Sequence, residues 1–350
     1  MLNIVKGRVL VDDLTSVCIR AMLKAGMREA DALVTADVLV TTDTWGVYTH
    51  GTKQLRPLLR HMRDGGLDPL ATPEVIAEAA GWARIDGHYA MPPFTAVQAM
   101  TITIEKARTA GIAYTGVFHS SHFGAAGYYA MMAAKAGLIG LAMTNVDPFM
   151  TVPGAKGRVL GTNPITYAIP AGNERPVFLD MATSTVAASK VFAADHLGKS
   201  IPDTWIVDKE GRPTTDPAQL MAGGAMQAMA GYKGYGIALL IEILAGVLTG
   251  AAFTTDIKTW ITDTDAHINQ GHCFIAIDPN IMMPFSDFTA RMDELVRRIK
   301  CTPTSPGTER IYLPGEMEWD RRDDALINGI PLPEDVINNL RAVEKEWALD

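Results

Sequence analysis

The pattern of apolar residues at the start of the chain is helical. Between residues 11 and 44 they recur at intervals of three and four, the spacing of one face of an amphipathic helix. The same spacing returns at 55–62, where Gly65-Gly66 ends it and Thr49 is a possible N-cap. The segment Thr49-His50-Gly51 is therefore predicted at a helix N-terminus, where outward-pointing N–H groups favour anions.

Short apolar runs alternate with helical patterns through the middle of the chain, which is typical of an α/β protein. Strands are predicted at 74–79, 82–86, 112–118, 138–144, 165–169, 177–180 and 272–277, with a hairpin at 205–212. Helices are predicted at 92–108, 125–136, 185–194, 235–252, 287–299 and 334–347. We expect an α/β lobe over 79–284 and a helical lobe that combines 1–78 with 285–350.

The most apolar stretch of the chain, 237–248, is a buried helix rather than a membrane segment by its pattern. It spans 12 residues and contains Glu242, so it is too short to cross a bilayer. We interpret the helix at 235–252 as part of the lobe core, with a subunit interface as the alternative. The first 25 residues carry charges and no continuous apolar segment, so they do not resemble a signal peptide.

Composition narrows the range of functions. Of the 350 residues, 48% are hydrophobic and 20% charged, a balance that supports a packed core and excludes disorder. The 31 basic and 39 acidic side chains give a net charge of −8, without a basic block for nucleic acid or an anionic membrane. Cys18, Cys273 and Cys301 are far apart, which disfavours disulfides and a zinc site and fits a reducing cytoplasm.

The motifs of common nucleotide-binding and hydrolase folds are missing. No G-x-G-x-x-G follows a strand, and no G-x-x-x-x-G-K-[ST] occurs. The motifs H-E-x-x-H and G-x-S-x-G are also absent, which argues against a zinc protease and an α/β-hydrolase. A standard Rossmann dinucleotide site and a P-loop are therefore disfavoured.

A loop with two histidines is the first candidate for chemistry. The segment from His119 to Gly124 follows a predicted strand and precedes a predicted helix, where α/β proteins place ligand-binding loops. His122 suits acid/base work, because the pKa of an imidazole lies near neutrality. A structural histidine and a metal ligand are the alternatives. No cysteine or carboxylate lies nearby in sequence to complete a metal site, so we predict no metal.

Four other segments are candidates for binding, each with a plainer interpretation. The segment 160–164 (LGTNP) is equally a turn. In 180–184 (DMATS), a hydroxyl can cap a helix, or Asp180 can orient a histidine or a ribose. Lys233 lies among glycines that let a phosphate approach, although a lone lysine is usually solvated. Pro314-Gly315-Glu316 is a turn by default.

Six segments together resemble the type 2 malate/L-lactate dehydrogenase family. They are DTWGVYTHG (43–51), SSHFGAAGYYA (120–130), LGTNP (160–164), DMATS (180–184), KGYGIALLIEILAGVL (233–248) and LPGE (313–316). They follow the family order over about 270 residues. The resemblance implies an α/β fold whose nicotinamide-binding lobe has a mixed sheet and is not Rossmann-like, together with a helical lobe and a homodimer.

The resemblance also implies that NAD, or NADP, serves to interconvert a small 2-hydroxy acid and its 2-oxo acid. The family residues that hold the dinucleotide correspond here to Asn163, Asp180, Met181, Ala182, Lys233, Gly234, Pro314, Gly315 and Glu316. Because no arginine cluster adjoins these motifs, NAD is favoured over NADP. We expect a cytoplasmic enzyme with a small-molecule substrate.

Catalytic residues are implied by the same resemblance. Relatives place the acid/base histidine at the position of His50 or of His122, and imino-acid reductases use residues that correspond to Thr49, His50 and Asp180. We expect both histidines to line one pocket, one as proton donor and the other as an orienting or oxyanion-stabilising group. Asp180 would hold an imidazole tautomer or a ribose hydroxyl.

The sequence departs from the family pattern at the substrate end. Trp45 and Gln54 stand where many relatives have arginine, and Arg56 is shifted by two positions. We expect Arg56 and Thr49 to contact the substrate, but the usual carboxylate clamp is in doubt because it depends on the guanidinium fork. Two alternatives stay open: reduction of a cyclic C=N bond on the same scaffold, and a non-catalytic binding protein.

Overall fold

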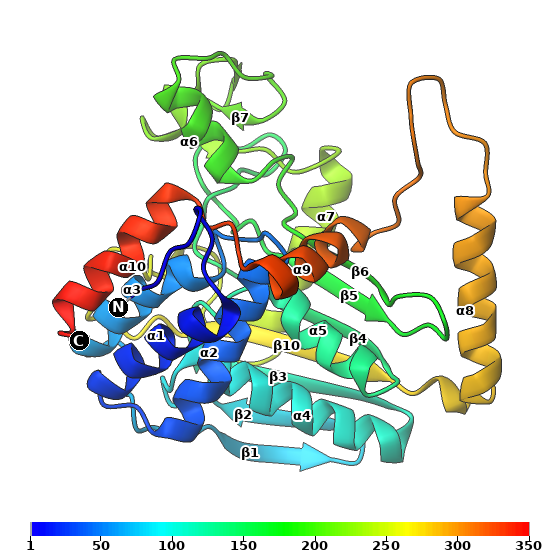
Figure 1. The fold of residues 1–350 in the computed structure, drawn as a ribbon. Helices are drawn as coiled ribbons and strands as arrows, with labels where there is room; N and C mark the ends of the chain where they lie inside the picture. Colours follow the sequence, from blue (N-terminus) through cyan, green and yellow to red (C-terminus); the bar gives the residue numbers. More distant parts are fainter. Residues whose placement is uncertain (1, 350) are drawn as a thin grey trace.

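A seven-stranded mixed sheet runs through the middle of the protein, and the computed structural model describes residues 2–349 (Figure 1). The strand order is β1-β2-β3-β10-β4-β5-β6, in which β2 and β3 are parallel and the other neighbours antiparallel. The strands are β1 (Glu74–Ala79), β2 (Trp82–Asp86), β3 (Ile112–Ser120), β4 (Ile139–Thr144), β5 (Ile165–Ile169), β6 (Val177–Met181) and β10 (Gln270–Ile277).

Helices cover both faces of this sheet. On one face lie α4 (Pro92–Ala110) and α5 (Ala126–Lys135); α4 begins with prolines that suit a first turn and ends at Gly111, whose φ is 85°. On the other face, α7 (Tyr232–Ile241) continues into the π-helical turn η3 (Glu242–Val247), which contacts β3, β4 and β10. Cover on both sides explains why the central strands β3 and β10 are almost continuously apolar.

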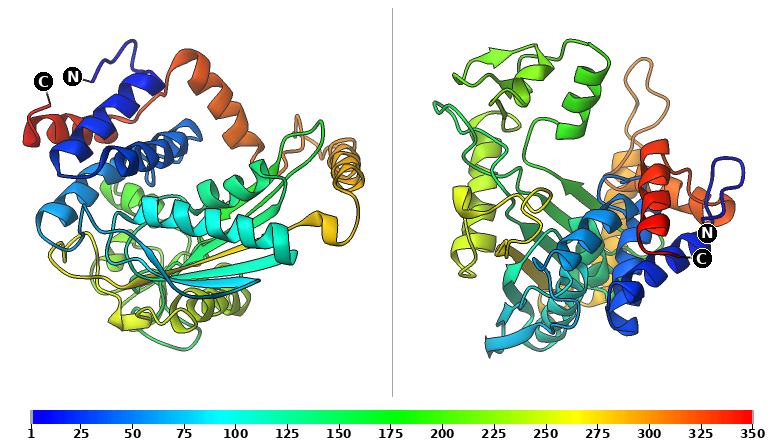
Figure 2. Two further views of the ribbon diagram at one scale, coloured as in Figure 1. Left: turned by 90° about the horizontal axis from the view of Figure 1, so that it is seen from below. Right: turned by 90° about the vertical axis from the view of Figure 1, so that its left-hand side faces the viewer.

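The two ends of the chain share one helical group. The helices α1 (Val11–Lys24), α2 (Glu29–Thr44), α3 (Leu55–Arg63) and α10 (Glu334–Glu346) pack around a common core of buried aliphatic side chains (Figures 1 and 2). Both views place the N-terminus and the C-terminus close together on this group. The helices α1, α3 and α10 each bury one apolar stripe, as the three- and four-residue spacing in the sequence predicts, whereas α2 is buried over most of its surface.

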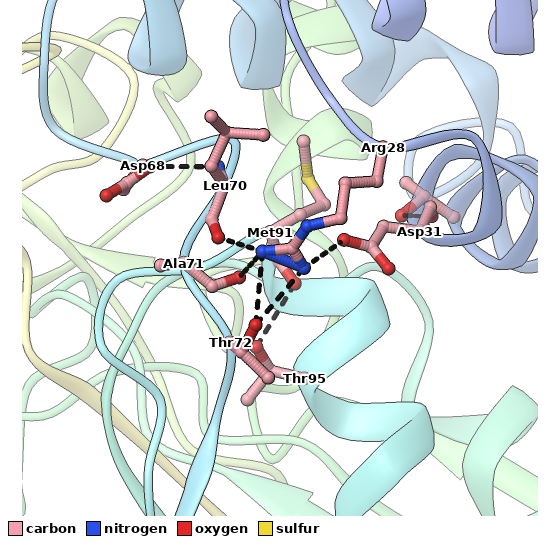
Figure 3. A network of polar contacts seen from close by, with 9 residues as sticks. Arg28, Asp31, Asp68, Leu70, Ala71, Thr72, Met91 and Thr95 are labelled. Carbon is pink, nitrogen blue, oxygen red and sulfur yellow. Dashed lines mark hydrogen bonds and ion pairs between the residues drawn. The ribbon is translucent and has the colours of Figure 1, made fainter.

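Arg28 ties the start of α2 to the loop that leads into β1 (Figure 3). Its guanidinium donates to Oδ2 of Asp31 (3.2 Å), to Oγ1 of Thr72 (3.1 Å) and to the backbone carbonyl of Leu70. Because one planar cation satisfies acceptors from both segments, the helical group is held at a fixed distance from the edge of the sheet.

A smaller body with its own core projects from the main sheet (Figure 1). It contains α6 (Ala188–His196) and a three-stranded sheet of order β8-β7-β9, with β7 (Ile206–Val207), β8 (Pro213–Thr214) and β9 (Ala225–Met226). The hairpin predicted at 205–212 corresponds to the antiparallel pair of β7 and β8.

Two helices after the last strand lie apart from each other. The helix α8 (Phe285–Lys300) lies at the edge of the molecule, away from α1, α2, α3 and α10 in both Figures 1 and 2. Asp293 on α8 accepts hydrogen bonds from the backbone N–H groups of 172–174, so α8 is attached to the β5–β6 turn. The following loop leads to α9 (Glu316–Asn328), which contacts α2.

The structure confirms the α/β fold class with a mixed sheet and a helical group. It corrects the prediction for 235–252, because the helix begins at Tyr232 and changes to π geometry at Glu242. Ile241 and Ala245 are buried against the sheet. The interpretation of this helix as lobe core is wrong for its outward face. The exposed side chains of that face are Leu239, Leu240, Ile243, Val247 and Leu248.

None of the helices described between residues 2 and 349 has the length and apolar character that crossing a membrane requires.

Candidate active site

A cavity of about 230 Å³ lies between the helical group, the main sheet and the smaller body. Its walls come from the loop after α2, the β3–α5 loop, the ends of β4 and β6, and the start of β10. The polar lining residues are Thr49, His50, His122, Thr144, Thr162, Asp180 and Gln270. The cavity therefore brings together Thr49, both histidines and Asp180, which are far apart in the sequence.

Asp43 anchors the loop that carries Thr49 and His50. Its Oδ2, buried at the end of α2, accepts hydrogen bonds from the N–H (3.0 Å) and the hydroxyl (2.5 Å) of Thr52. Gly51 passes so close that an added Cβ would lie 1.9 Å from Oδ1 of Asp43. The conformation of the loop is therefore fixed by the buried side chain of Asp43 and by Gly51, which leaves room for it.

Thr49 does not cap a helix, contrary to the prediction. A short 3-10 turn, η1 (Thr52–Gln54), precedes α3, and no side chain caps either element. The Thr49 hydroxyl instead lies 2.9 Å from the ring nitrogen Nδ1 of His50. The backbone N–H of His50 donates to the carbonyl of Val47 (3.0 Å). The extra turn moves Thr49 away from the start of the helix, so its hydroxyl is used within the cavity.

His122 reaches the cavity through a turn with two left-handed residues. His119 has a φ of 51° and Gly124 a φ of 84°, and between them the chain leaves β3 and heads into α5. The N–H of Gly124 donates to Nδ1 of His122 (3.3 Å), so Nε2 carries the hydrogen of the neutral ring and is a donor. The predicted position of this loop, after a strand and before a helix, is confirmed.

Three aromatic rings form a stack along the cavity wall. The ring centroids of His50 and His122 are 5.4 Å apart, and Trp260 lies on the other side of His122 at 4.6 Å. Burial lowers the pKa of His50, and burial together with His50 and His272 lowers the pKa of His122 well below its usual value. Both imidazoles are therefore neutral at pH 7 and able to accept a proton.

Asp180 lies at the end of β6 and holds the first turn of α5. Its Oδ2 accepts the N–H of Gly127 (2.7 Å), one of the unpaired donors at the helix N-terminus. Burial, with a smaller contribution from Glu318, raises the pKa of Asp180 to about 6 against the opposing effect of the hydrogen bond from Gly127. No hydrogen bond joins Asp180 to either imidazole among the residues described, so it positions the loop of His122 through α5.

A neutral polar wall, which the sequence analysis did not identify, closes the inner end of the cavity. Gln270 donates to Oγ1 of Thr144 (3.0 Å), and Thr144 lies 2.8 Å from Nδ1 of the buried His272. The other ring nitrogen of His272 meets Ser120 Oγ at 2.8 Å, and burial lowers the pKa of His272 to about 3. The only sequence signal is the polar residues at the start of the apolar strand β10.

Asn163 supports the cavity from behind. It is fully buried, and its amide donates to Oε2 of Glu242 (2.6 Å) and to the carbonyl of Ala238 (3.1 Å). Its Oδ1 accepts the N–H of Val146, which lines the cavity (3.1 Å). Glu242 also accepts the N–H of Thr254, so this pair ties the start of the π-helical turn to two loops. The side chain of Asn163 itself is not part of the cavity lining.

The remaining residues expected at the dinucleotide lie on two sides of the cavity. Met181 and Ala182 line the cavity. Thr183, which follows them, is joined to the segment before α7, because its carbonyl accepts a hydrogen bond from the N–H of Met229 (2.9 Å). Lys233 is exposed in the first turn of α7, and Gly234 is packed so closely that a Cβ would lie 2.2 Å from the carbonyl of Met229. The free N–H groups and the ammonium there fit a phosphate.

The segment 314–316 lies by a second cavity, of about 320 Å³, on the far side of β6. The N–H of Phe178 donates to the carbonyl of Pro314 (3.2 Å), which fixes this segment to the edge strand. Arg56 also lies outside the first cavity, where its guanidinium forms an ion pair with Glu346. Within residues 2–349, no three His, Cys, Asp or Glu side chains are grouped as metal ligands.

Asp43→Asn is expected to flatten the pH dependence of stability. Burial raises the pKa of Asp43 from 3.8 to about 7, so the folded state holds this proton more tightly than the unfolded chain does. The stability that this group contributes is therefore complete below about pH 4 and is lost as the pH rises to about 7, by up to about 1.4 kcal/mol per pH unit. Denaturant unfolding at several pH values between 4.5 and 7.5 measures the slope (roughly linear in this window). Equal slopes in variant and wild type contradict the assignment.

Comparison with known proteins places the whole chain in one family. The family model for malate/L-lactate dehydrogenase matches residues 9–341. A malate dehydrogenase from Pyrococcus abyssi is 34% identical over 345 residues, 97% of this chain and 94% of the relative. The NAD(+)-dependent ureidoglycolate dehydrogenase of Escherichia coli K12 is 32% identical over 321 residues, 91% of this chain and 90% of the relative.

Solved structures agree with these matches. A sulfolactate dehydrogenase from Methanocaldococcus jannaschii superposes with a TM-score of 0.90 at 33% identity, covering 97% of both chains. The delta1-piperideine-2-carboxylate reductase of Pseudomonas syringae superposes with a TM-score of 0.85 at 28% identity, covering 96% of this chain and 99% of that one. The matches extend over nearly the full length in every case.

Proposed function

The chain belongs to the malate/L-lactate dehydrogenase family, and we propose from this premise that its cavity interconverts a small 2-hydroxy acid and its 2-oxo acid with NAD. Relatives are named for malate, sulfolactate and ureidoglycolate, and one of them for NAD(+). The observation that carries the proposal is the stacked pair of imidazoles, His50 and His122, in a cavity bounded by Asp180, Met181 and Ala182.

When bound, NAD would supply the hydride acceptor for oxidation of the hydroxy acid, and NADH the hydride donor for reduction of the oxo acid. The residues of the chain move the proton. During oxidation a neutral imidazole takes the hydroxyl proton, and burial keeps His50 and His122 in the neutral form that can accept it. During reduction the imidazolium gives the proton to the carbonyl oxygen as negative charge builds there. We assign the proton transfer to Nε2 of His50, whose Nδ1–H can donate to the Thr49 hydroxyl. Nε2 of His122 carries the ring hydrogen, because Nδ1 accepts from Gly124, and it acts as the donor that stabilises the substrate oxygen.

The other residues of the proposed site bind and position. Thr49 orients His50 and contacts the substrate, whereas Arg56 can contact it only after leaving Glu346. Asn163 acts through the N–H of Val146. The residues proposed to hold the dinucleotide directly are Asp180, Met181 and Ala182 on the wall, Lys233 and Gly234 at the start of α7, and Pro314, Gly315 and Glu316 beyond β6.

Oxidation of NADH and NADPH against a panel of 2-oxo acids and cyclic imines tests the proposal. We expect turnover with 2-oxo acids and a preference for NADH. Turnover with cyclic imines alone would establish the alternative of a cyclic imino-acid reductase, which the superposition on the piperideine-2-carboxylate reductase supports. Cofactor binding without turnover of any carbonyl or imine would leave the alternative of a binding protein.

We propose that the protein is a homodimer formed through the apolar face of α7 and η3. Leu240 and Val247 on this face are 50% and 54% exposed. A contiguous exposed apolar face is typical of a protein–protein contact. Leu240→Asp is expected to convert the dimer to a monomer, because it leaves a charge in the apolar centre of the interface. Light scattering after gel filtration measures the mass, with Ile327→Asp on α9 as the exposed control. An unchanged dimer in Leu240→Asp contradicts this assignment.

We also propose a division into a helical lobe (1–78 with 285–350) and an α/β lobe (79–284), and a cytoplasmic location. The shared core of α1, α2, α3 and α10 supports the first lobe for these helices, whereas α8 lies apart from them, attached to the β5–β6 turn. The cysteines support the location, since Cys18 and Cys273 are buried thiols and Cys301 is an exposed one, as a reducing compartment permits.

A further inference from the structure

The proposed active site contains no fixed positive charge. The residues that line the cavity include no lysine and no arginine; the titratable ones are His50, His122 and Asp180. Burial keeps both imidazoles neutral, while Asp180, whose pKa is about 6, is mostly a carboxylate at pH 7. An empty cavity of this composition is neutral to negative, which is unusual for a site that takes an organic acid.

The cations nearest in sequence to Thr49 and His50 are used elsewhere. Lys53, three residues after His50, forms an ion pair with Asp335 (2.6 Å), and Arg56 forms one with Glu346. At the two positions where an arginine would follow the family pattern, Trp45 is buried against Phe178 (ring centroids 5.3 Å apart) and the Gln54 amide donates to the carbonyl of Thr49. No cation on this loop is left for a substrate.

The charges that act on the cavity are of the wrong sign for a second anion. Glu318 on α9 raises the pKa of Asp180, and the groups that shift the pKa of His122 are His50 and His272, which are neutral. A second anion in the cavity therefore meets the carboxylate of Asp180 and no cation among the lining residues.

Uncharged donors are what the inner wall offers instead. The amide of Gln270 is 2% exposed and lines the cavity, backed by Thr144 and the permanently neutral His272. Thr49 adds a hydroxyl on the opposite side. Such groups bind a carbonyl or an amide well, and a single bound carboxylate raises the pKa of the imidazole that it faces, so that one ring of the pair can balance it as an imidazolium. Nothing in the lining balances a second one.

We propose that the substrate is a 2-oxo acid (or its 2-hydroxy acid) whose only charge is its own carboxylate, with an uncharged side chain, and that Gln270 determines this specificity. This inference rests on the proposed function, and it separates the chain from a site for dicarboxylates or sulfonated acids. The side chain of such a substrate faces the amide of Gln270, and its carboxylate faces the pair His50 and His122.

A matched pair of substrates tests the inference. Oxaloacetate and its 4-amide, 2-oxosuccinamate, have nearly the same shape and differ by one negative charge. We expect kcat/KM with NADH to be higher for the amide by about 10-fold or more, because an unpaired buried charge is costly. Equal values, or a preference for oxaloacetate, overturn the inference while leaving the proposed function intact. If neither compound is reduced and no other 2-oxo acid is, the proposed function fails and the inference falls with it.

Variants at Gln270 locate the determinant. Gln270→Lys places an ammonium on the wall and is expected to reduce the preference for the amide or reverse it, with most of the change in KM. Gln270→Met removes the amide without adding charge and is expected to weaken the amide substrate alone. Lys190, an exposed residue of α6, is the cation that movement of this helix would bring to the cavity. Because the inference assigns it no role, Lys190→Met is expected to leave the ratio of kcat/KM for the two substrates unchanged. A ratio that responds to Lys190 and not to Gln270 contradicts the assignment.

Discussion

His122→Ala is expected to lower kcat by about 10²- to 10³-fold, the range for loss of a donor that stabilises a developing oxyanion. His122 lies between His50 and Trp260 with Nδ1 engaged by Gly124, so no neighbouring side chain can replace its Nε2. Steady-state kinetics measure kcat, and fluorescence titration with NADH measures cofactor affinity, which we expect to change little. His50→Ala is expected to fall in the same range, because the two rings act as a pair.

The matched control is His196→Ala, an exposed histidine on α6, which is expected to leave kcat within about 2-fold, as surface substitutions usually do. If both His50→Ala and His122→Ala retain wild-type kcat, the mechanism is wrong. If one alone is affected, that residue is the proton donor and the other serves only to pack against it.

Gly51→Ala is expected to cost about 3 kcal/mol or more in the free energy of unfolding, at the upper end for overpacked cores. The added Cβ would lie 1.9 Å from Oδ1 of Asp43, which is itself fixed by two hydrogen bonds from Thr52. Since the loop carries His50, we expect kcat to fall as well. Denaturant unfolding measures the stability, and steady-state assays measure the rate.

A double variant separates this clash from a general effect of the substitution. Asp43→Ala removes the carboxylate that the new methyl group would meet, so Gly51→Ala is expected to cost much less in that background. Additive losses in the double variant would show that the close approach of Gly51 to Asp43 is not the reason for the glycine.

The sequence predicts the elements whose periodicity matches their surroundings. The strands at 74–79, 82–86 and 165–169 coincide with β1, β2 and β5, since alternating or fully apolar runs between turns have one interpretation. Helix α9 was not predicted at all. It is rich in charge, and its large apolar residues Leu326 and Ile327 are exposed, so no buried stripe marks it in the sequence.

The exposed face of helix α7 is also not predictable from the sequence. The helix is apolar on all sides, which is typical of a helix buried all round, and only the folded arrangement reveals that one face of α7 and η3 is left open. The prediction that Thr49 is an N-cap is wrong because local spacing does not reveal the 3-10 turn at 52–54.

The site was predictable only where a motif carried it. His50 and His122 stand in glycine-containing segments too polar for a core, and the structure brings their rings together. Trp260 and Gln270 are single residues in unremarkable segments. Trp260 stacks on His122 and Gln270 lines the cavity, both through long-range contacts that no local pattern records. Asn163, by contrast, was singled out from a motif, and its side chain turns inward to Glu242.

Transfer of deuterium from NADH deuterated at C4 of the nicotinamide tests the central claim most directly. The claim is that the cavity around His50 and His122 passes a hydride between NADH and C2 of a 2-oxo acid. With one of the two C4-deuterated epimers, NMR of the product is predicted to show a 2-hydroxy acid that carries one deuterium at C2, and His122→Ala is predicted to abolish its formation. A 2-hydroxy acid without deuterium from either epimer, or undiminished transfer in His122→Ala and His50→Ala, would contradict the account.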